Sequence, residues 1–160
     1  MQGGERLPVE DILRIRMLKH SYCALADECA SPTAGDAARQ LAALFVEDGV
    51  WTADPEYGGH HVGRAAIEQL FSGLAQVFPY GAHMATNDRI TVNGDAAVGH
   101  WKSIVPCTWI IEGKAAACWI FGGYTDDYVK VDGEWKIQIM RSIVQQSCRH
   151  DAGWVSGDRS

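Results

Sequence analysis

One charged side chain near the C-terminus stands out against its apolar neighbours. Alternate positions between residues 134 and 147 carry Trp135, Ile137, Ile139, Arg141 and Ile143. In a β-strand these positions share one face of the sheet, which places the guanidinium of Arg141 among apolar side chains. An unpaired buried charge is costly. Arg141 is therefore expected to meet a buried partner or a ligand, or to extend to water at the rim of the sheet.

Two other regions hold side chains suited to acid–base chemistry. Asp27 and Glu28 lie near the end of an expected helix, where each carboxylate opposes the helix dipole by about 0.3–1 kcal/mol. Either both are solvated, or one has a compensating donor. His83 opens an expected strand. Histidine is the most common general base, and a structural histidine is the alternative interpretation.

The motifs of several other chemistries are missing from the sequence. It contains no CxxC and no HxxxH spacing, so we expect no metal site. Its glycines form neither a G-x-G-x-x-G nor a Walker pattern, and no G-x-S-x-G is present. We therefore expect no cofactor, which leaves acid–base chemistry or ligand binding.

Composition limits the class of protein. The 160 residues are 47% hydrophobic, which predicts one domain over 1–160, with a core of about 8–148 and loose tails at 1–7 and 149–160. A net charge of −6 argues against nucleic acid or an anionic membrane as a partner. Five irregularly spaced cysteines favour free thiols and a cytoplasmic location. Trp154 is the exception in the tail, because a tryptophan is expected to pack on a neighbour or over a pocket mouth.

The order of elements predicts an α+β fold. Helical spacing of apolar residues marks segments from Pro8 to about Cys29, after Asp36 as far as Phe45, and around 63–77. A short strand is expected at 49–53. Long strands at 83–92, 96–111, 115–131 and 134–147 are separated by turn signals such as Asn93-Gly94. Such long antiparallel strands must coil, which predicts a cone-like curved sheet wrapped around the helices and enclosing one pocket.

This order of features resembles the SnoaL-like branch of the nuclear-transport-factor-2-like superfamily. The similar stretches are YCALAD (22–27), LAALFVEDGVW (41–51), GRAAIEQLF (63–71), HMATNDRITVNGDAAVGHW (83–101) and YTDDYVKVDGEWKI (124–137). Within this branch the chain is most similar to scytalone dehydratase, hexachlorocyclohexane dehydrochlorinase and bile-acid 7α-dehydratase. The resemblance implies a cofactor-independent lyase.

The same resemblance implies a set of catalytic residues. His83 matches the family's general base, and Asp27 matches the aspartate that orients it. Tyr22 and Arg141 match residues that stabilise charge on the departing oxygen or on an enolate. The sequence departs from scytalone dehydratase at Ala26, where that family has a tyrosine, and at Cys107, where it has a second histidine.

A hydrophobic cyclic substrate, such as a steroid, polyketide or aromatic precursor, is the implied ligand. We expect a substrate-binding set that supplies apolar contacts, made up of Trp51, Trp101, Cys107, Trp119 and Phe121. The dehydratase relatives also favour a homo-oligomer, with a trimer preferred over a dimer.

Three other functions stay open. The chain also resembles ketosteroid isomerase, for which Asp54 would be the base and Asp126 the protonated acid. A polyketide-cyclase-like enzyme is a further possibility. The small subunit of aromatic-ring dioxygenases has this fold without catalysis, so a non-catalytic subunit or ligand-binding module is the third alternative.

Overall fold

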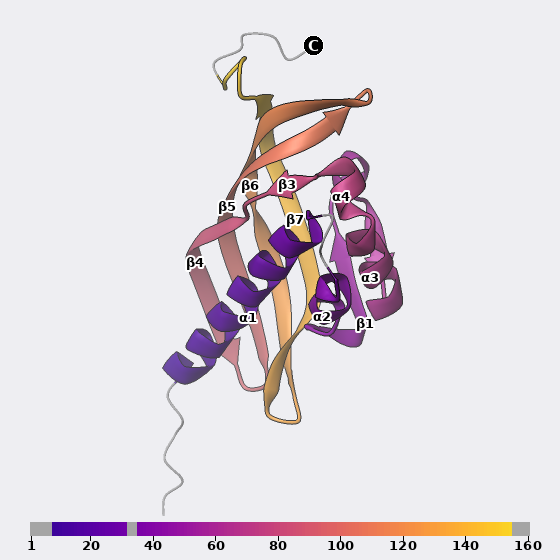
Figure 1. Cartoon of the computed structure of the whole chain (residues 1–160). Helices are drawn as coiled ribbons and strands as arrows, with labels where there is room; N and C mark the ends of the chain where they lie inside the picture. Colours follow the sequence, from indigo (N-terminus) through magenta and orange to yellow (C-terminus); the bar gives the residue numbers. More distant parts are fainter. Residues whose placement is uncertain (1–7, 32–34, 155–160) are drawn as a thin grey trace, which may run out of the picture.

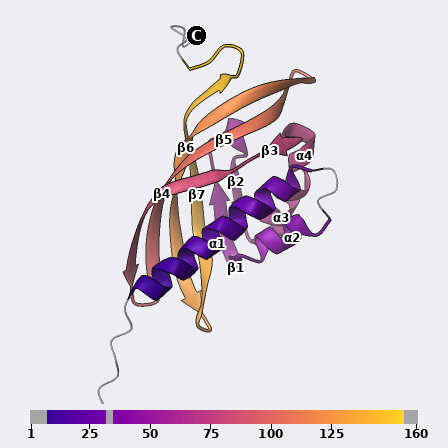
Figure 2. The same cartoon turned by 60° about the vertical axis from the view of Figure 1, so that its left-hand side comes forward.

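The longest helix, α1 (Pro8–Cys29), lies across one face of a seven-stranded sheet (Figure 1, Figure 2). The computed structural model describes residues 8–31 and 35–154. The predicted loose segment 1–7 and the last six residues, 155–160, lie outside this range. The helix has the predicted bounds, and its inward face carries Ile15, Tyr22 and Ala26, all buried. The same face also buries Lys19, which the apolar periodicity did not predict.

The sheet consists of a long antiparallel meander with additional strands at both edges. Its hydrogen-bonded order is β2-β1-β7-β6-β5-β3, and β4 also pairs with β5. The strands are β1 (Phe45–Thr52), β2 (His60–Val62), β3 (Tyr80–Gly81), β4 (Met84–Asn93), β5 (Ala96–Ile111), β6 (Lys114–Val131) and β7 (Glu134–Arg149). The meander of β4 to β7 is antiparallel, as predicted, whereas β1 runs parallel to β7, so the whole sheet is mixed. The α+β class is confirmed.

The predicted hairpin turns occur where the sequence places them. Strands β5 and β6 are joined by Glu112 and Gly113, and strands β6 and β7 by Asp132 and Gly133. All four residues have positive φ, between 50° and 82°. Two-residue turns of this kind match the twist of the strands that they join, and the glycine adopts its conformation without a steric penalty. The turns fix the register of the meander.

The shorter elements differ from the sequence-based expectation. Helix α2 (Ala37–Ala42) is shorter than predicted, and Phe45 begins β1 instead of continuing a helix. The third predicted helix is divided at Gly73 into α3 (Arg64–Ser72) and α4 (Leu74–Val77). A 3₁₀ helix, η1 (Pro55–Tyr57), follows β1. In Figure 1, α2, α3 and α4 lie to the right of α1.

A β-bulge in β7 reverses the expected orientation of Arg141. Tyr128 pairs with Ile137 and Asp127 pairs with Ile139, so Gln138 is an extra residue in β7. One inserted residue moves every following side chain to the opposite face. Met140 is therefore buried, whereas Arg141 lies on the other face and donates to Asp127 Oδ2 over 2.8 Å. The prediction that Arg141 shares a face with Trp135 and Ile137 was wrong.

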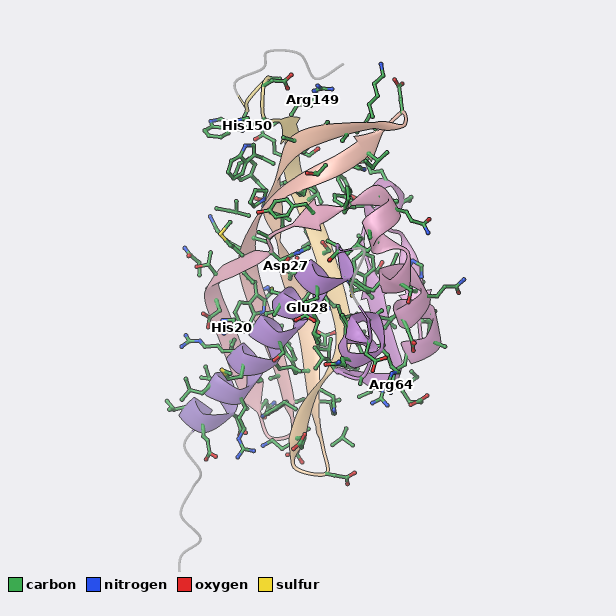
Figure 3. The ribbon with its side chains drawn as sticks, in the orientation of Figure 1. His20, Asp27, Glu28, Arg64, Arg149 and His150 are labelled. Carbon is green, nitrogen blue, oxygen red and sulfur yellow. The ribbon has the colours of Figure 1, made fainter. Side chains whose placement is uncertain are left out.

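Residues 150–154, predicted to be loose, form a turn against β6. The backbone N–H of His150 donates to the Ala117 carbonyl, and Trp119 Nε1 donates to His150 Nδ1 over 2.9 Å. The Trp154 ring contacts Phe121 edge-on, with centroids 5.7 Å apart. Figure 3 shows His150 and Arg149 at the upper end of the sheet, above Asp27. None of the helices described here has the length and apolar character needed to cross a membrane.

Candidate functional site

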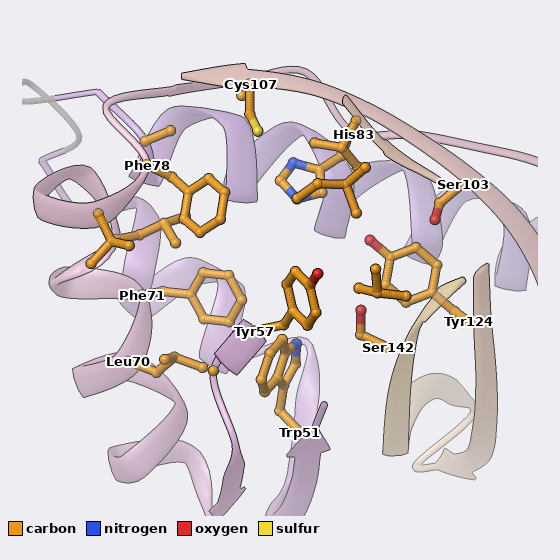
Figure 4. Close-up of a pocket in the computed structure, with 18 of the residues that line it drawn as sticks. Trp51, Tyr57, Leu70, Phe71, Phe78, His83, Ser103, Cys107, Tyr124 and Ser142 are labelled. Carbon is orange, nitrogen blue, oxygen red and sulfur yellow. The ribbon is translucent and has the colours of Figure 1, made fainter. Parts of the chain in front are cut away.

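A cavity of about 340 Å³ lies between the helices and the inward face of the sheet (Figure 4). Its wall draws on α1, η1, α3, α4 and the strands β5, β6 and β7. Most of the wall is aromatic or aliphatic, with contributions from Trp51, Phe71, Phe78, Val105 and Ile120. A cavity of this size and apolarity suits a small hydrophobic molecule with few polar groups.

His83 and Asp27 meet at the edge of this cavity. His83 Nδ1 lies 2.7 Å from Asp27 Oδ1, and the backbone N–H of His83 donates to the same oxygen over 2.8 Å. His83 lines the cavity, whereas Asp27 lies behind the imidazole and does not. The two side chains are 21% and 34% exposed. Figure 3 shows Asp27 and Glu28 near the end of α1, where donors from His83 compensate the carboxylate of Asp27.

This geometry fixes the tautomer of the neutral imidazole. A carboxylate accepts hydrogen bonds, so Nδ1 of His83 must carry the proton that it shares with Asp27. The other ring nitrogen, Nε2, is then unprotonated in the neutral ring, and His83 lines the cavity. Because one Asp27 oxygen contacts both the backbone N–H and the ring of His83, it also restrains the plane of the imidazole. Asp27 thus holds the His83 imidazole in one orientation.

Tyr22 contributes a hydroxyl group to the cavity. Its oxygen accepts a hydrogen bond from Trp51 Nε1 over 2.9 Å. Because an indole N–H can only donate, the Tyr22 proton is left to donate elsewhere. Burial raises the pKa of Tyr22, so it stays a neutral phenol. Tyr22 and Trp51 both line the cavity.

Three further hydroxyl groups line the cavity, from Ser103, Tyr124 and Ser142. They lie on adjacent strands, with Tyr124 of β6 directly paired with Ser142 of β7. Sequence reasoning missed all three. The alternation within β6 carried the signal, because its even-numbered positions, including Tyr124 and Tyr128, are the buried ones.

Behind the cavity wall, Lys19 and Asp126 form a fully buried ion pair. Lys19 Nζ lies 2.9 Å from Asp126 Oδ2, which also accepts a hydrogen bond from the Tyr128 hydroxyl. Burial lowers the pKa of Lys19 and raises the pKa of Asp126, while their mutual attraction opposes both shifts. Asp126 Oδ1 is buried without a hydrogen-bond partner among the residues described. Asp126, the predicted acid of the isomerase alternative, does not line the cavity.

Several other predicted site residues lie away from the cavity. Trp119 and Phe121 occupy odd-numbered positions of β6, stack on each other with centroids 6.1 Å apart, and face the opposite side of the sheet. Trp101 is a core residue that donates to the Tyr128 hydroxyl. Asp54 is exposed at the start of η1. Arg141 is held by Asp127 on the outer face. None of these five side chains lines the cavity.

Cys107 does line the cavity, as predicted for a substrate contact. Burial raises the pKa of its thiol to about 12, so the thiol stays neutral and acts as an apolar contact. Among the residues described, no group of three or more His, Cys, Asp or Glu side chains is arranged to hold a metal ion.

We expect Cys107 to resist alkylation in the folded protein, because only the thiolate reacts. Iodoacetamide at about pH 8 should modify the partly exposed Cys148 first, and Cys107 only after denaturation. Peptide mass spectrometry over a time course measures both. A sample unfolded in guanidinium is the control, in which both cysteines should react. Equal rates for Cys107 and Cys148 in the native protein would contradict the assignment of a buried neutral thiol.

Comparisons with known proteins agree with this architecture. The profile of the SnoaL-like domain family matches residues 8–141. A protein of unknown function from Mycobacterium tuberculosis is 28% identical, with a TM-score of 0.72 over 90% of this chain and 77% of the other. A search of curated proteins found no match.

Two solved structures with named activities share the fold. A candidate scytalone dehydratase from Novosphingobium aromaticivorans is 23% identical, with a TM-score of 0.73 and 89% of each chain covered. A hexachlorocyclohexane dehydrochlorinase from Novosphingobium barchaimii is 19% identical, with a TM-score of 0.75 over 94% of this chain and 97% of the other. The family match spans most of the chain, and the helices, coiled sheet and cavity fit it. The chain therefore belongs to the SnoaL-like family, within the nuclear-transport-factor-2-like fold.

Proposed function

We propose that this protein is a cofactor-independent lyase that eliminates water, or a similar leaving group such as chloride, from a hydrophobic cyclic substrate. The observation that carries this proposal is the 2.7 Å contact between His83 and Asp27 at the edge of an apolar cavity. An imidazole held by a carboxylate on one nitrogen is a general base on the other.

In the proposed reaction, His83 Nε2 removes a proton from a carbon next to a ketone. The C–H electron pair moves towards the carbonyl and gives an enolate, whose negative charge lies on oxygen. The enolate then re-forms the ketone and expels a hydroxyl group from the neighbouring carbon. The imidazolium returns its proton to this group, so water leaves and His83 is neutral again. Asp27 stabilises the imidazolium during this cycle.

The cavity supports this chemistry by excluding water. Charge that develops inside an apolar enclosure interacts more strongly with nearby dipoles than it would in water. The Tyr22 proton, which Trp51 leaves free to donate, is one such dipole. The related fold of a dehydrochlorinase and a candidate dehydratase fits an elimination reaction. The base and the acid of the isomerase alternative receive no such support, since Asp54 and Asp126 do not line the cavity.

A direct test is a panel of cyclic β-hydroxy ketones and chlorinated cyclohexanes of increasing size. Formation of the conjugated enone is followed by ultraviolet absorbance, and release of chloride by ion chromatography. We expect turnover of at least one compound that fits a cavity of about 340 Å³. His83→Gln protein is the control for background reaction. Tight binding of panel compounds without any turnover would instead favour a ligand-binding module.

A further inference from the structure

The proposed reaction places negative charge on a substrate oxygen, and the cavity wall holds no obvious cation. Among the residues described as lining the cavity, none is lysine or arginine, and the charged or titratable side chains other than the phenols and Cys107 are His83 and Glu56. Arg141, expected to supply this charge, lies on the other face of the sheet with Asp127. An enolate in an apolar enclosure nevertheless needs compensation.

The buried ammonium group of Lys19 lies directly behind two tyrosines that line the cavity. Lys19 Nζ is 3.3 Å from the centroid of the Tyr124 ring and 5.0 Å from that of Tyr22. The two rings meet edge to face, 6.2 Å apart. A cation against an aromatic face is attractive, and more so when both are desolvated. Lys19 is thus in contact with the back of the wall on which a substrate would lie.

The Tyr124 hydroxyl is the group through which this charge can act. Tyr124 lines the cavity, and Figure 4 shows its hydroxyl directed inward on the side of His83. No residue in the described part of the chain makes a hydrogen bond to it. Burial raises the pKa of Tyr124 well above its usual value, so the group keeps its proton and donates. A substrate oxygen is the natural acceptor.

We propose that Tyr124 is a catalytic residue that donates a hydrogen bond to the substrate oxygen, and that Lys19 is a positioning residue that strengthens this donor from behind the ring. The ammonium polarises the phenol towards the cavity and opposes the charge that accumulates on the substrate. It does so without contacting the substrate, so an apolar molecule can still occupy the cavity. This inference rests on the proposed function and names its oxyanion-binding group.

The surroundings of Lys19 explain how a charge can persist there. Asp126 holds the ammonium at 2.9 Å, and Met140 Sδ accepts a weaker contact at 3.8 Å. Trp101 donates to the Tyr128 hydroxyl, which in turn donates to Asp126. This chain of hydrogen bonds stabilises the carboxylate in a dry environment, and the attraction of the carboxylate opposes the lowering of the Lys19 pKa by burial. Asp126 and Met140 thus occupy two sides of the Lys19 ammonium group, and the face of the Tyr124 ring occupies a third.

Probe binding tests the inference without any knowledge of the substrate. The ligands are p-nitrophenolate, whose oxygen carries a full charge, and 4-nitroanisole, a neutral analogue of similar shape. Dissociation constants are measured by absorbance or calorimetry at a pH where the phenol is ionised. The variants are Tyr124→Phe, which keeps the ring over Lys19, and the double variant Lys19→Met with Asp126→Asn, which removes both charges together.

We expect Tyr124→Phe and the double variant each to weaken p-nitrophenolate binding about tenfold or more, which is the effect of losing a donor to a charged acceptor. Binding of 4-nitroanisole should change by less than about twofold, since the shape of the cavity is kept. The matched control removes a second lysine–aspartate pair that also stacks on a ring, Lys130 with Asp11 beside Trp135. Lys130→Met with Asp11→Asn should leave both affinities unchanged.

Several outcomes would overturn the inference. They are no binding of p-nitrophenolate by the unaltered protein, unchanged binding by Tyr124→Phe, or equal losses for both probes in the double variant. Should the double variant not fold in buffer, the Tyr124→Phe comparison still decides the question for the hydroxyl, and the double variant assayed in a stabilising osmolyte decides it for the ammonium. The His83→Gln protein should still bind p-nitrophenolate in preference to 4-nitroanisole. If the protein prefers p-nitrophenolate but turns over no compound of the substrate panel, the proposed lyase activity is rejected and the oxyanion-binding site is retained.

Discussion

Replacing His83 by glutamine should lower the rate constant of elimination by about 10²–10⁴, the usual contribution of a general base. Glutamine fills a similar volume but offers no basic nitrogen to the cavity. The effect should fall on kcat, with KM nearly unchanged, because the cavity wall that binds the substrate is otherwise intact. Steady-state kinetics on the best compound of the panel measure it, with circular dichroism to show that the variant is folded.

Asp27→Asn is the informative companion to this variant. Asp27 Oδ1 accepts hydrogen bonds from both the backbone and the ring of His83, and an asparagine oxygen can keep both. The substitution therefore removes the negative charge while retaining the orientation of the imidazole. A smaller loss, about 10–10² in kcat, is expected from the weaker support of the imidazolium. If both variants kept nearly full activity, His83 would not be the base.

Lys19→Met should destabilise the protein by about 3–5 kcal/mol at neutral pH, the usual cost of removing one member of a buried ion pair. Methionine fills the space of the lysine stem, so the loss is chiefly that of an unpaired Asp126 carboxylate in a dry core. Denaturant unfolding followed by tryptophan fluorescence measures the free energy of unfolding. Lys130→Met should cost less, since the Lys130 side chain is 12% exposed and water can reach Asp11.

The pH dependence of this deficit provides a second check. Burial raises the pKa of Asp126 in the folded state above its unfolded value, and removal of the lysine cation strengthens that shift. Below the unfolded pKa, Asp126 is protonated in both the folded and the unfolded state, so its ionisation does not lower the stability of Lys19→Met. As pH rises above that value, the unfolded state releases the proton more readily than the folded state, so stability falls. The deficit of Lys19→Met should therefore grow between about pH 4 and pH 8.

Adding Asp126→Asn to Lys19→Met should restore most of the stability, because no charge is then left unpaired. Asparagine can still accept the hydrogen bond from the Tyr128 hydroxyl. A double variant as unstable as Lys19→Met, with a deficit that does not change with pH, would show that packing, and not the lost charge pair, determines the cost.

Local sequence signals predicted α1 and the long strands with their hairpins, and they drew attention separately to Asp27 and His83. The period of apolar residues from Pro8 to Cys29 predicts α1, and the turn residues at 112–113 and 132–133 predict the hairpins, because both depend on nearest neighbours. Asp27 was notable as a carboxylate at a helix C-terminus, and His83 as a polar residue opening a strand. The resemblance to a family suggested that they meet, and the fold brings their atoms within 2.7 Å.

The incorrect predictions of site residues share one cause. The sequence did not show which face of the sheet each strand residue occupies. Arg141 lies on the outer side because Gln138 is an extra residue in β7, and no single-strand pattern reveals an insertion that exists only relative to a partner. Trp119 and Phe121 were expected to bind substrate because they are aromatic. Their parity in β6 places them on the other face, and the same parity turns Tyr124 towards the cavity.

By itself, then, the amino-acid sequence determined α1, the hairpins and the α+β class, since these follow from local periodicity and turn chemistry, and it marked Asp27 and His83 as candidates for acid–base chemistry. Only the tertiary structure decided which side chains face the cavity. It also decided that Lys19, a lysine in an otherwise ordinary helix, is buried against Asp126 and the Tyr124 ring. A charge enters a core only where partners distant in sequence compensate it, and those partners exist only once the sheet has closed over the helix.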